Sequence, residues 1–401
     1  MRYFNINSIL KPVLAGFVFF ISAGCNKDYQ QPSAPPSGNA GPTIWQIIDS
    51  GGSYTTLKTA ILKAGLDSVL NTAGNSLTLF APDDNAFALS GITPVTVQGL
   101  SAAQLQEILS YHIIPSALPS SLIPAAFPNT EMPTLLQLDP TNPLIKMDIF
   151  PWKTSSNQLY ANSIPVTVAD QAASNGVIHT VAAVVTPPSE LLASLIYGDT
   201  TLTYLAAAIA RADSGQVGLN KVDSLLKYPL INMTILAPNN SAFQNILYEE
   251  VYGTLLQEGV PAGTASAEAS ALSSSPNIFS NPLLYDVLTA ATVRGILVYH
   301  ILAIQASGSY EPLDRVFSVN FPSVPGSFVT TLVNSAYPSH PGIMALAVFS
   351  GPIVNDLQFT GLGTFPPGGM PYSGTTAHAV KMDEIGVNGV VHIIDQVLLP
   401  Q

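Results

Sequence analysis

The sequence has little charge of either sign. Only 9% of its 401 residues are charged, and 13 Lys and Arg against 25 Asp and Glu leave a net charge of −12, whereas roughly 25% of residues are charged in an ordinary soluble domain. So few basic residues form no basic patch, and we expect no nucleic-acid partner. The apolar fraction of 47% is ordinary. It is enough for a core and argues against disorder.

Cysteine is almost absent, and long apolar runs are confined to the N-terminus. Cys25 is the single cysteine, which excludes disulfides within the chain and Cys-based metal sites. After the first 25 residues no stretch reaches 18 consecutive apolar residues. We therefore expect a soluble body without a membrane-spanning helix.

The N-terminus has the layout of an export signal. A basic start is followed by an apolar run over 13–21 and by small residues at 22–24 that precede Cys25. The string Ile-Ser-Ala-Gly-Cys resembles a bacterial lipobox, in which the cysteine is lipidated and becomes the new N-terminus. We predict a lipoprotein signal peptide over 1–24 and a lipidated Pro/Ser-rich tether over 25–42. The alternatives are a plain signal peptide and a buried free thiol.

Two residues after the anchor bear on location. Lys27-Asp28 resembles the short surface-export signals of Bacteroidota lipoproteins. The resemblance implies an outer-membrane lipoprotein on the cell surface, with the periplasmic face as the alternative.

The remainder of the sequence contains two copies of one unit. Residues 79–87 match 235–243, Tyr111-His112 matches Tyr299-His300, and 175–179 match 388–392. The order of these motifs is kept while their spacing grows in the second copy, which therefore carries insertions. Pro187 of the first copy also aligns with Pro400 of the second. We predict domain 1 over 43–188 and domain 2 over 189–401.

Each copy predicts the same elements in the same order. An apolar stripe at i, i+3, i+4 and i+7 predicts a helix over 57–64, and buried strands are expected at 77–81 and 177–181. Asp83 and Asp84 are expected to cap a short helix that follows the first strand. The second copy repeats each feature, with Asn239 and Asn240 as the capping residues.

The Tyr-His pairs lie at the ends of predicted helices. Each histidine belongs to an apolar helical stripe, which contains Leu105 and Leu109 before His112 and their counterparts before His300. Such a histidine is either a buried neutral imidazole bonded to a backbone carbonyl or a contact for a ligand. The apolar neighbours favour the first interpretation.

Together these motifs resemble the fasciclin-like domain, and most closely at 388–400, Asn-Gly-Val-Val-His-Ile-Ile-Asp-Gln-Val-Leu-Leu-Pro. The resemblance covers nearly all of 43–401 and implies an α+β fold, two wedge-shaped β-sandwiches with packed helices. Family members are extracellular adhesion and matrix-binding modules, as a rule without catalytic machinery. Their Tyr-His segment is implicated in integrin contact, which makes Tyr111, His112, Tyr299 and His300 candidate binding residues. The chain departs from the family pattern at Ala182, which aligns with Asp395.

The insertions of the second copy are the other candidate binding regions, because loops on a rigid scaffold often carry function. They span 248–286 and 304–379, and their tyrosines Tyr310, Tyr337 and Tyr372 are suited to stacking on sugar rings or gripping a protein. The alternative is that these aromatics form small clusters of their own.

No catalytic motif is present. We find no zinc-binding His pair, no nucleophile elbow and no phosphate-binding glycine loop, so we expect no enzyme, cofactor or metal. The sequence favours a non-catalytic, cell-surface adhesion or ligand-binding lipoprotein whose partner is an extracellular protein or polysaccharide. The alternatives are a glycan-capture accessory of a polysaccharide uptake system and a structural spacer of the envelope.

Overall fold

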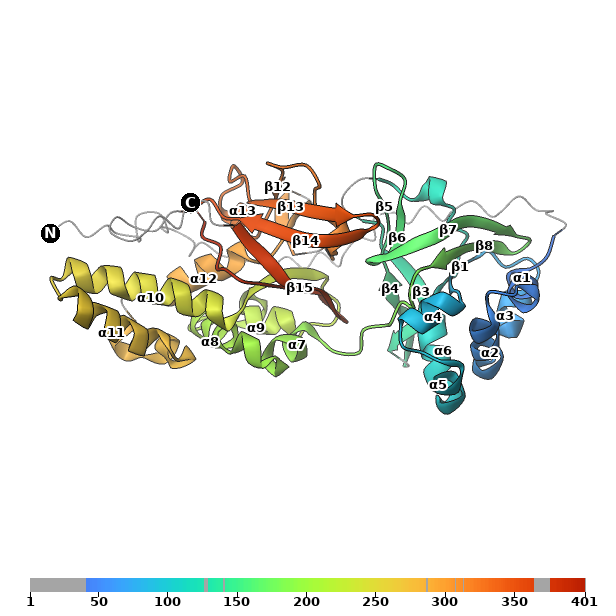
Figure 1. Cartoon of the computed structure of the whole chain (residues 1–401), viewed down its shortest axis with the longest axis horizontal. Coiled ribbons are helices and arrows are strands. Elements are labelled where there is room, and N and C mark those ends of the chain that lie inside the picture. Colours follow the sequence, from blue (N-terminus) through green and yellow to red (C-terminus); the bar gives the residue numbers. More distant parts are fainter. Residues whose placement is uncertain are drawn as a thin grey trace. The chain divides into compact units, whose positions relative to one another are not determined.

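The computed structural model describes residues 41–125, 129–139, 141–285, 288–306, 308–312, 314–363 and 376–400 (Figure 1). The chain divides between Pro188 and Ser189 into two compact units. We call 41–188 the N-terminal unit and 189–400 the C-terminal unit, and each is described by itself. The predictions for 1–24, for Cys25 and for Tyr372 lie outside the described residues, as does nearly all of the tether.

In its described residues, the N-terminal unit combines six α-helices with a mixed sheet of order β2-β1-β8-β7-β6-β5 and a separate β3–β4 hairpin. Its helices are α1 (Ile44–Ser50), α2 (Thr55–Ala64), α3 (Asp67–Asn71), α4 (Asp84–Leu89), α5 (Pro94–Gly99), α6 (Ala102–Tyr111) and the 3-10 helix η2 (Ser120–Leu122). Its strands are β1 (Leu77–Pro82), β2 (Ile113–Ile114), β3 (Met132–Asp139), β4 (Asn142–Ile149), β5 (Pro151–Lys153), β6 (Leu159–Ala161), β7 (Ile164–Ala173) and β8 (Gly176–Val181).

The core of this unit lies between its helices and one face of the sheet. The predicted stripe on α2 is buried, and Leu57 and Ile61 pack with Leu79 of β1 and Ile178 of β8. Because side chains alternate along a strand, Phe80 and its neighbour across the ladder, His179, face the other side of the sheet. The sheet is therefore buried on both faces at its centre.

The C-terminal unit repeats this plan with a sheet of order β12-β13-β14-β15-β16-β9 and a β10–β11 hairpin. Its helices are α7 (Leu192–Gly198), η3 (Thr200–Leu202), α8 (Thr203–Ala212), η4 (Gly218–Asn220), α9 (Val222–Leu226), α10 (Asn240–Gln257), α11 (Ala262–Ser273), η5 (Pro276–Ser280), η6 (Pro282–Leu284), α12 (Ala290–Tyr299), η7 (Ser318–Asn320) and α13 (Val333–Ala336). Its strands are β9 (Met233–Pro238), β10 (Ile304–Ala306), β11 (Ser309–Glu311), β12 (Phe328–Val329), β13 (Ile343–Ser350), β14 (Ile353–Thr360), β15 (Thr376–Gly386) and β16 (Gly389–Ile394). Both units are thus α+β.

A parallel pair of strands forms the centre of each unit. Strand β1 pairs with β8 from Leu77↔Gly176 onward, and β9 pairs with β16 from Met233↔Gly389 in the same register. Gly176 has φ +152°, and a Cβ atom there would lie 2.0 Å from the carbonyl oxygen of Leu77. The glycine of the Asn-Gly motif therefore permits the close approach of β1 and β8. The hairpin loop between β7 and β8 consists of residues 174–175.

Helix capping differs in part from the sequence prediction. Asp83 caps α4 through a hydrogen bond from Ala86 N–H. Asp84 instead accepts hydrogen bonds from Thr55 N–H and Thr56 N–H at the start of α2. Asn240 does the same for α8 by accepting from Tyr204 N–H. The second capping residue thus links its own helix to another, which its position in the sequence does not reveal.

The first insertion is helical rather than loop-like. The predicted short helix after β9 is wrong for the C-terminal unit, because α10 runs for 18 residues and turns back into α11 (Figure 1). Small residues let the two helices approach, since Ala265 and Ala269 of α11 have no exposed surface. Tyr248 and Tyr252 stack on each other along α10.

Among the described residues, no single helix combines the length and apolarity that a membrane crossing requires. The bent pair formed by α7 and 200–212 passes such a test by length and composition, with a bend of 85°. Leu192, Ile196 and Leu205 of this pair belong to the core of the C-terminal unit.

Candidate functional site

The Tyr-His side chains of both copies are buried. Tyr111 and Tyr299 have no exposed surface, and their hydroxyls donate to the carbonyls of Asp148 (3.0 Å) and Gly342 (2.8 Å). His112 and His300 are 0% and 1% exposed. The structure therefore places these four candidate binding residues in the cores, where a partner reaches them only if the unit opens.

Each buried histidine connects two backbone segments of its own unit through hydrogen bonds. His112 Nδ1–H donates to Ile108 O (2.8 Å), and its Nε2 accepts from Val185 N–H (3.0 Å). His300 repeats both bonds with Ile296 O and with the N–H of Leu398. Burial lowers the pKa of each imidazole to about 4. The two rings are therefore neutral, and each ties a helix end to the segment that follows the last strand.

A second polar network surrounds His179 and, in the second copy, His392; its Asp and Ser members were not predicted from the sequence. Nε2–H of His179 donates to Leu118 O, and its Nδ1 accepts from Asp170 N–H. Asp170 has a left-handed backbone with φ +61°, and its carboxylate accepts from the N–H and hydroxyl of Ser120. His392, Asp383 and Ser318 repeat this arrangement. The sequence contains one signal of this network, because the number of residues between the aspartate and the histidine is the same in both copies.

The asparagine of each Asn-Gly motif is also used internally. Asn175 has no exposed surface, accepts from Ile44 N–H, and donates to the carbonyls of Leu70 and Thr72. Asn388 repeats the three bonds in the C-terminal unit. The repeated polar side chains thus hold backbone segments together.

Two of the insertion tyrosines, Tyr310 and Tyr337, belong to the described residues. Tyr310 is half-buried and packs against the C-terminal core. Tyr337, at the end of α13, is 38% exposed. Of the phenylalanines in the same insertion, Phe321 is buried with its ring against Phe359, and Phe328 is exposed. The second insertion therefore contributes largely to the fold.

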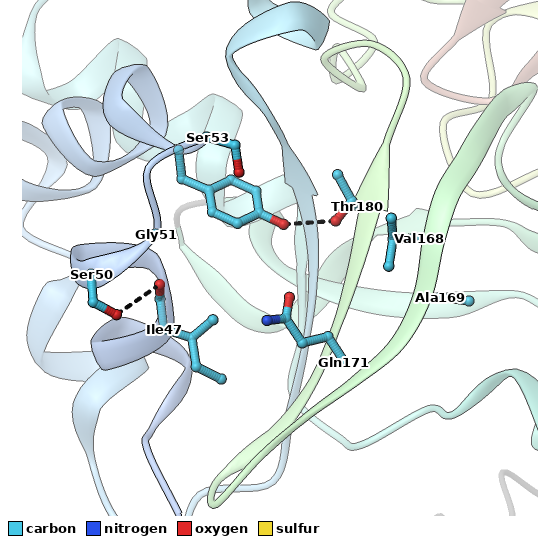
Figure 2. Close-up of a pocket in the computed structure, with 9 residues that line it drawn as sticks. Ile47, Ser50, Gly51, Ser53, Val168, Ala169, Gln171 and Thr180 are labelled. Atoms are coloured by element: carbon cyan, nitrogen blue, oxygen red, sulfur yellow. Dashed lines mark hydrogen bonds between the residues drawn. The ribbon is translucent and has the colours of Figure 1, made fainter.

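An open hollow of about 570 Å³ lies on the N-terminal unit, between the end of α1, the loop before α2, and strands β7 and β8 (Figure 2). Tyr54 and Thr180 form its floor, and their hydroxyls are 2.7 Å apart. Ser50, Ser53, Gln171 and the aliphatic side chains of Ile47, Val168 and Ala169 line the remainder, together with Gly51. Its lining carries no charged side chain. Sequence reasoning missed it because four separate elements contribute.

A second hollow, of about 520 Å³, lies on the C-terminal unit and is acidic. Its lining includes Glu249 of α10 and Asp395 after β16. One carboxylate oxygen of Asp395 accepts from His378 N–H (2.7 Å), so this residue, absent from the first copy, helps to hold β15. Among the described residues, no group of three His, Cys, Asp or Glu is arranged to hold a metal ion.

Comparison with known proteins identifies the N-terminal unit. The family model described as "Fasciclin domain" matches residues 52–187. The chain contains a fasciclin domain. The C-terminal unit repeats five strands of the sheet, β1-β8-β7-β6-β5, as β9-β16-β15-β14-β13, and it repeats the parallel strand pair and the buried Asn and His hydrogen bonds. The chain is therefore a tandem of fasciclin-like domains.

Curated relatives match parts of the chain. Fasciclin-like arabinogalactan protein 12 of Arabidopsis thaliana is 34% identical over 93 residues, which are 22% of this chain and 35% of that protein. Protein sll1483 of Synechocystis is 28% identical over 36% of this chain and 74% of its own length. Transforming growth factor-beta-induced protein ig-h3 of Sus scrofa is 31% identical over 39% of this chain and 20% of its own length. The chain thus spans about a third or less of the plant and animal relatives.

Among solved structures, a FAS1 domain pair from the insect cell adhesion molecule fasciclin I aligns with 88% of this chain and 94% of its own. The sequence identity is 15% and the TM-score 0.29.

Proposed function

We propose that this protein is a non-catalytic recognition protein, held at the cell surface by a lipid, that binds an extracellular protein or polysaccharide. The observation that carries the proposal is the duplicated fasciclin framework. Its repeated His, Asn and Asp side chains form hydrogen bonds with the protein's own backbone. A framework of this kind holds a rigid surface and leaves recognition to exposed, non-repeated residues.

The proposed anchor is Cys25, followed by the tether over 25–42. A single acyl chain binds membranes weakly, whereas the several chains of a bacterial lipoprotein anchor give stable attachment. The body would then stand clear of the membrane and meet partners outside it.

Capture of a glycan is the second candidate function. The neutral hollow on the N-terminal unit favours it, because it offers hydroxyl and amide groups beside aliphatic side chains. A pure spacer is the third candidate, and it predicts no specific partner.

Deletion of the gene and a Cys25→Ser variant test the proposal in the source cells. We expect protease added to intact cells to cleave the wild-type protein. Cell aggregation or attachment should fall when the gene is deleted. The Cys25→Ser form should leave the membrane fraction. A protected body would place the protein in the periplasm, and unchanged aggregation and attachment would favour the spacer.

A further inference from the structure

We propose that the hollow on the N-terminal unit, floored by Tyr54 and Thr180 and flanked by Val168 and Gln171, is a binding site for a neutral carbohydrate. The inference deepens the proposed recognition function by naming the class of ligand and the domain that binds it. It assigns recognition to the N-terminal unit rather than to the insertion tyrosines of the C-terminal unit.

The first argument is the charge of the site. In a chain of net charge −12, the lining contains no Asp, Glu, Lys or Arg. Asp170 is adjacent in sequence, but its carboxylate bonds to Ser120 on the side of the sheet where His179 lies. Thr180 points to the opposite side, since neighbouring side chains of β8 alternate. A charged ligand would find no counter-ion here, whereas a neutral one avoids the cost of an unpaired charge.

The second argument is the supply of polar groups. Within the described part of the chain, the Gln171 amide and the Ser53 hydroxyl make no side-chain hydrogen bond, and both residues are exposed. Figure 2 shows Gln171 and Ser53 on two sides of the hollow, one on β7 and the other in the loop before α2. An amide offers two donors and an acceptor, and a hydroxyl offers both roles. These groups match the vicinal hydroxyls of a sugar.

The third argument is shape. Ile47, Val168 and Ala169 give the hollow an aliphatic side that suits the C–H face of a pyranose ring. About 570 Å³ lies within the usual range of small-ligand sites. A stable protein partner needs roughly 1,000 Å² or more of buried surface.

The C-terminal unit supplies an internal control. Val168 and Gln171 pair with Thr180 and Ile178, and at the same register Lys381 and Glu384 pair with Ile393 and Val391. Lys381 and Glu384 form an ion pair of 2.8 Å.

The floor of the hollow differs as well. Tyr54, which precedes α2, is replaced by Leu202 before α8, and Thr180 by Ile393. The framework is kept while the hydroxyl floor and the neutral wall are lost, so we expect no carbohydrate site at this place in the C-terminal unit.

The test is calorimetric titration of the full chain with cellohexaose, laminarihexaose, mannohexaose and maltohexaose, with an oligogalacturonate as the charged probe. The variant Val168→Lys/Gln171→Glu brings the ion pair of the C-terminal unit into the hollow. The control variant Lys381→Val/Glu384→Gln makes the reverse change at the matched positions. All four residues lie on the surface of a strand, and urea unfolding of each variant verifies the fold.

We expect saturable binding of at least one neutral oligosaccharide and none of the oligogalacturonate. Binding should weaken about tenfold or more in Val168→Lys/Gln171→Glu and in Gln171→Ala, since each removes a polar contact, and stay within about twofold in the control. The site is overturned if no neutral probe binds, if the charged probe binds equally well, or if Val168→Lys/Gln171→Glu binds as the wild type does. Sugar binding without any effect of gene deletion on aggregation or attachment would contradict the proposed role in cell aggregation and attachment. It would still support the carbohydrate site.

Discussion

Acidification should destabilise each unit through one buried histidine. His112 is wholly buried, and its Nε2 accepts the Val185 N–H, so protonation breaks that bond and buries a charge. Burial lowers the pKa of His112 to about 4, against about 6.5 in an unfolded chain. Between these values the unfolded state binds the extra proton, so stability is full above pH 6.5 and is lost as the pH falls toward 4.

The size of the effect follows from the two pKa values. A separation of about 2.5 units corresponds to about 3 kcal/mol when fully expressed, of which about 2 kcal/mol is lost between pH 7.5 and pH 5. His179 adds to the loss in the same direction, because burial lowers its pKa as well. Against a typical domain stability of 5–15 kcal/mol the loss is large.

Tryptophan fluorescence isolates the N-terminal unit, because Trp45 and Trp152 are the two tryptophans of the chain and both lie in it. Urea unfolding at pH 7.5 and pH 5 measures the loss. In His112→Gln the difference between the two pH values should shrink by about 2 kcal/mol, whereas His300→Gln should leave the fluorescence-detected difference unchanged. The reasoning fails if His112→Gln keeps the whole pH dependence, or if NMR shows the His112 ring titrating near pH 6.5 in the native protein.

Three further predictions concern the stability of the two units. Asn175→Leu should cost the N-terminal unit about 3 kcal/mol, because three backbone groups, two of them buried, lose their partner, while Asn388→Leu leaves the fluorescence transition in place. Gly176→Ala should give little soluble protein, since its Cβ meets a backbone carbonyl at 2.0 Å, and expression yield checks this. Asp213→Ala should cost about 3 kcal/mol or more, because it leaves the buried Arg294 unpaired and removes the acceptor of two backbone N–H groups. Arg294→Met should cost less, because those two N–H groups still bind the Asp213 carboxylate; circular dichroism during urea unfolding compares the two.

The repeated framework could be predicted from the sequence. Each shared motif contains both the apolar residues of an element and the polar residue that ends or links it, as in the strand of Leu79 followed by Asp83. These interactions are local or recur at fixed spacing, so two copies suffice to identify them. The buried neutral state of His112 and His300 was favoured by the same apolar stripe that buries them.

The first insertion was misread because its pattern is not amphipathic. Residues 262–273 are rich in Ala, Ser and Gly, which suggested a loop, but alanine has the highest intrinsic helix propensity. The helix is stabilised by close packing of Ala265 and Ala269 against α10 rather than by a stripe of large side chains. Periodicity of large apolar residues is therefore a poor guide where small residues make the contact.

The hollow could not be found from one copy of the sequence, because Ile47, Tyr54, Val168 and Thr180 come from distant segments. Comparison of the two copies after folding makes it visible. Selection on the fold keeps the buried Asn and His bonds the same in both, whereas the residues around the hollow differ in charge and polarity at matched registers. If both units merely spaced the envelope, nothing would require that difference, and exchanging these residues between the units would leave cell aggregation and attachment unchanged.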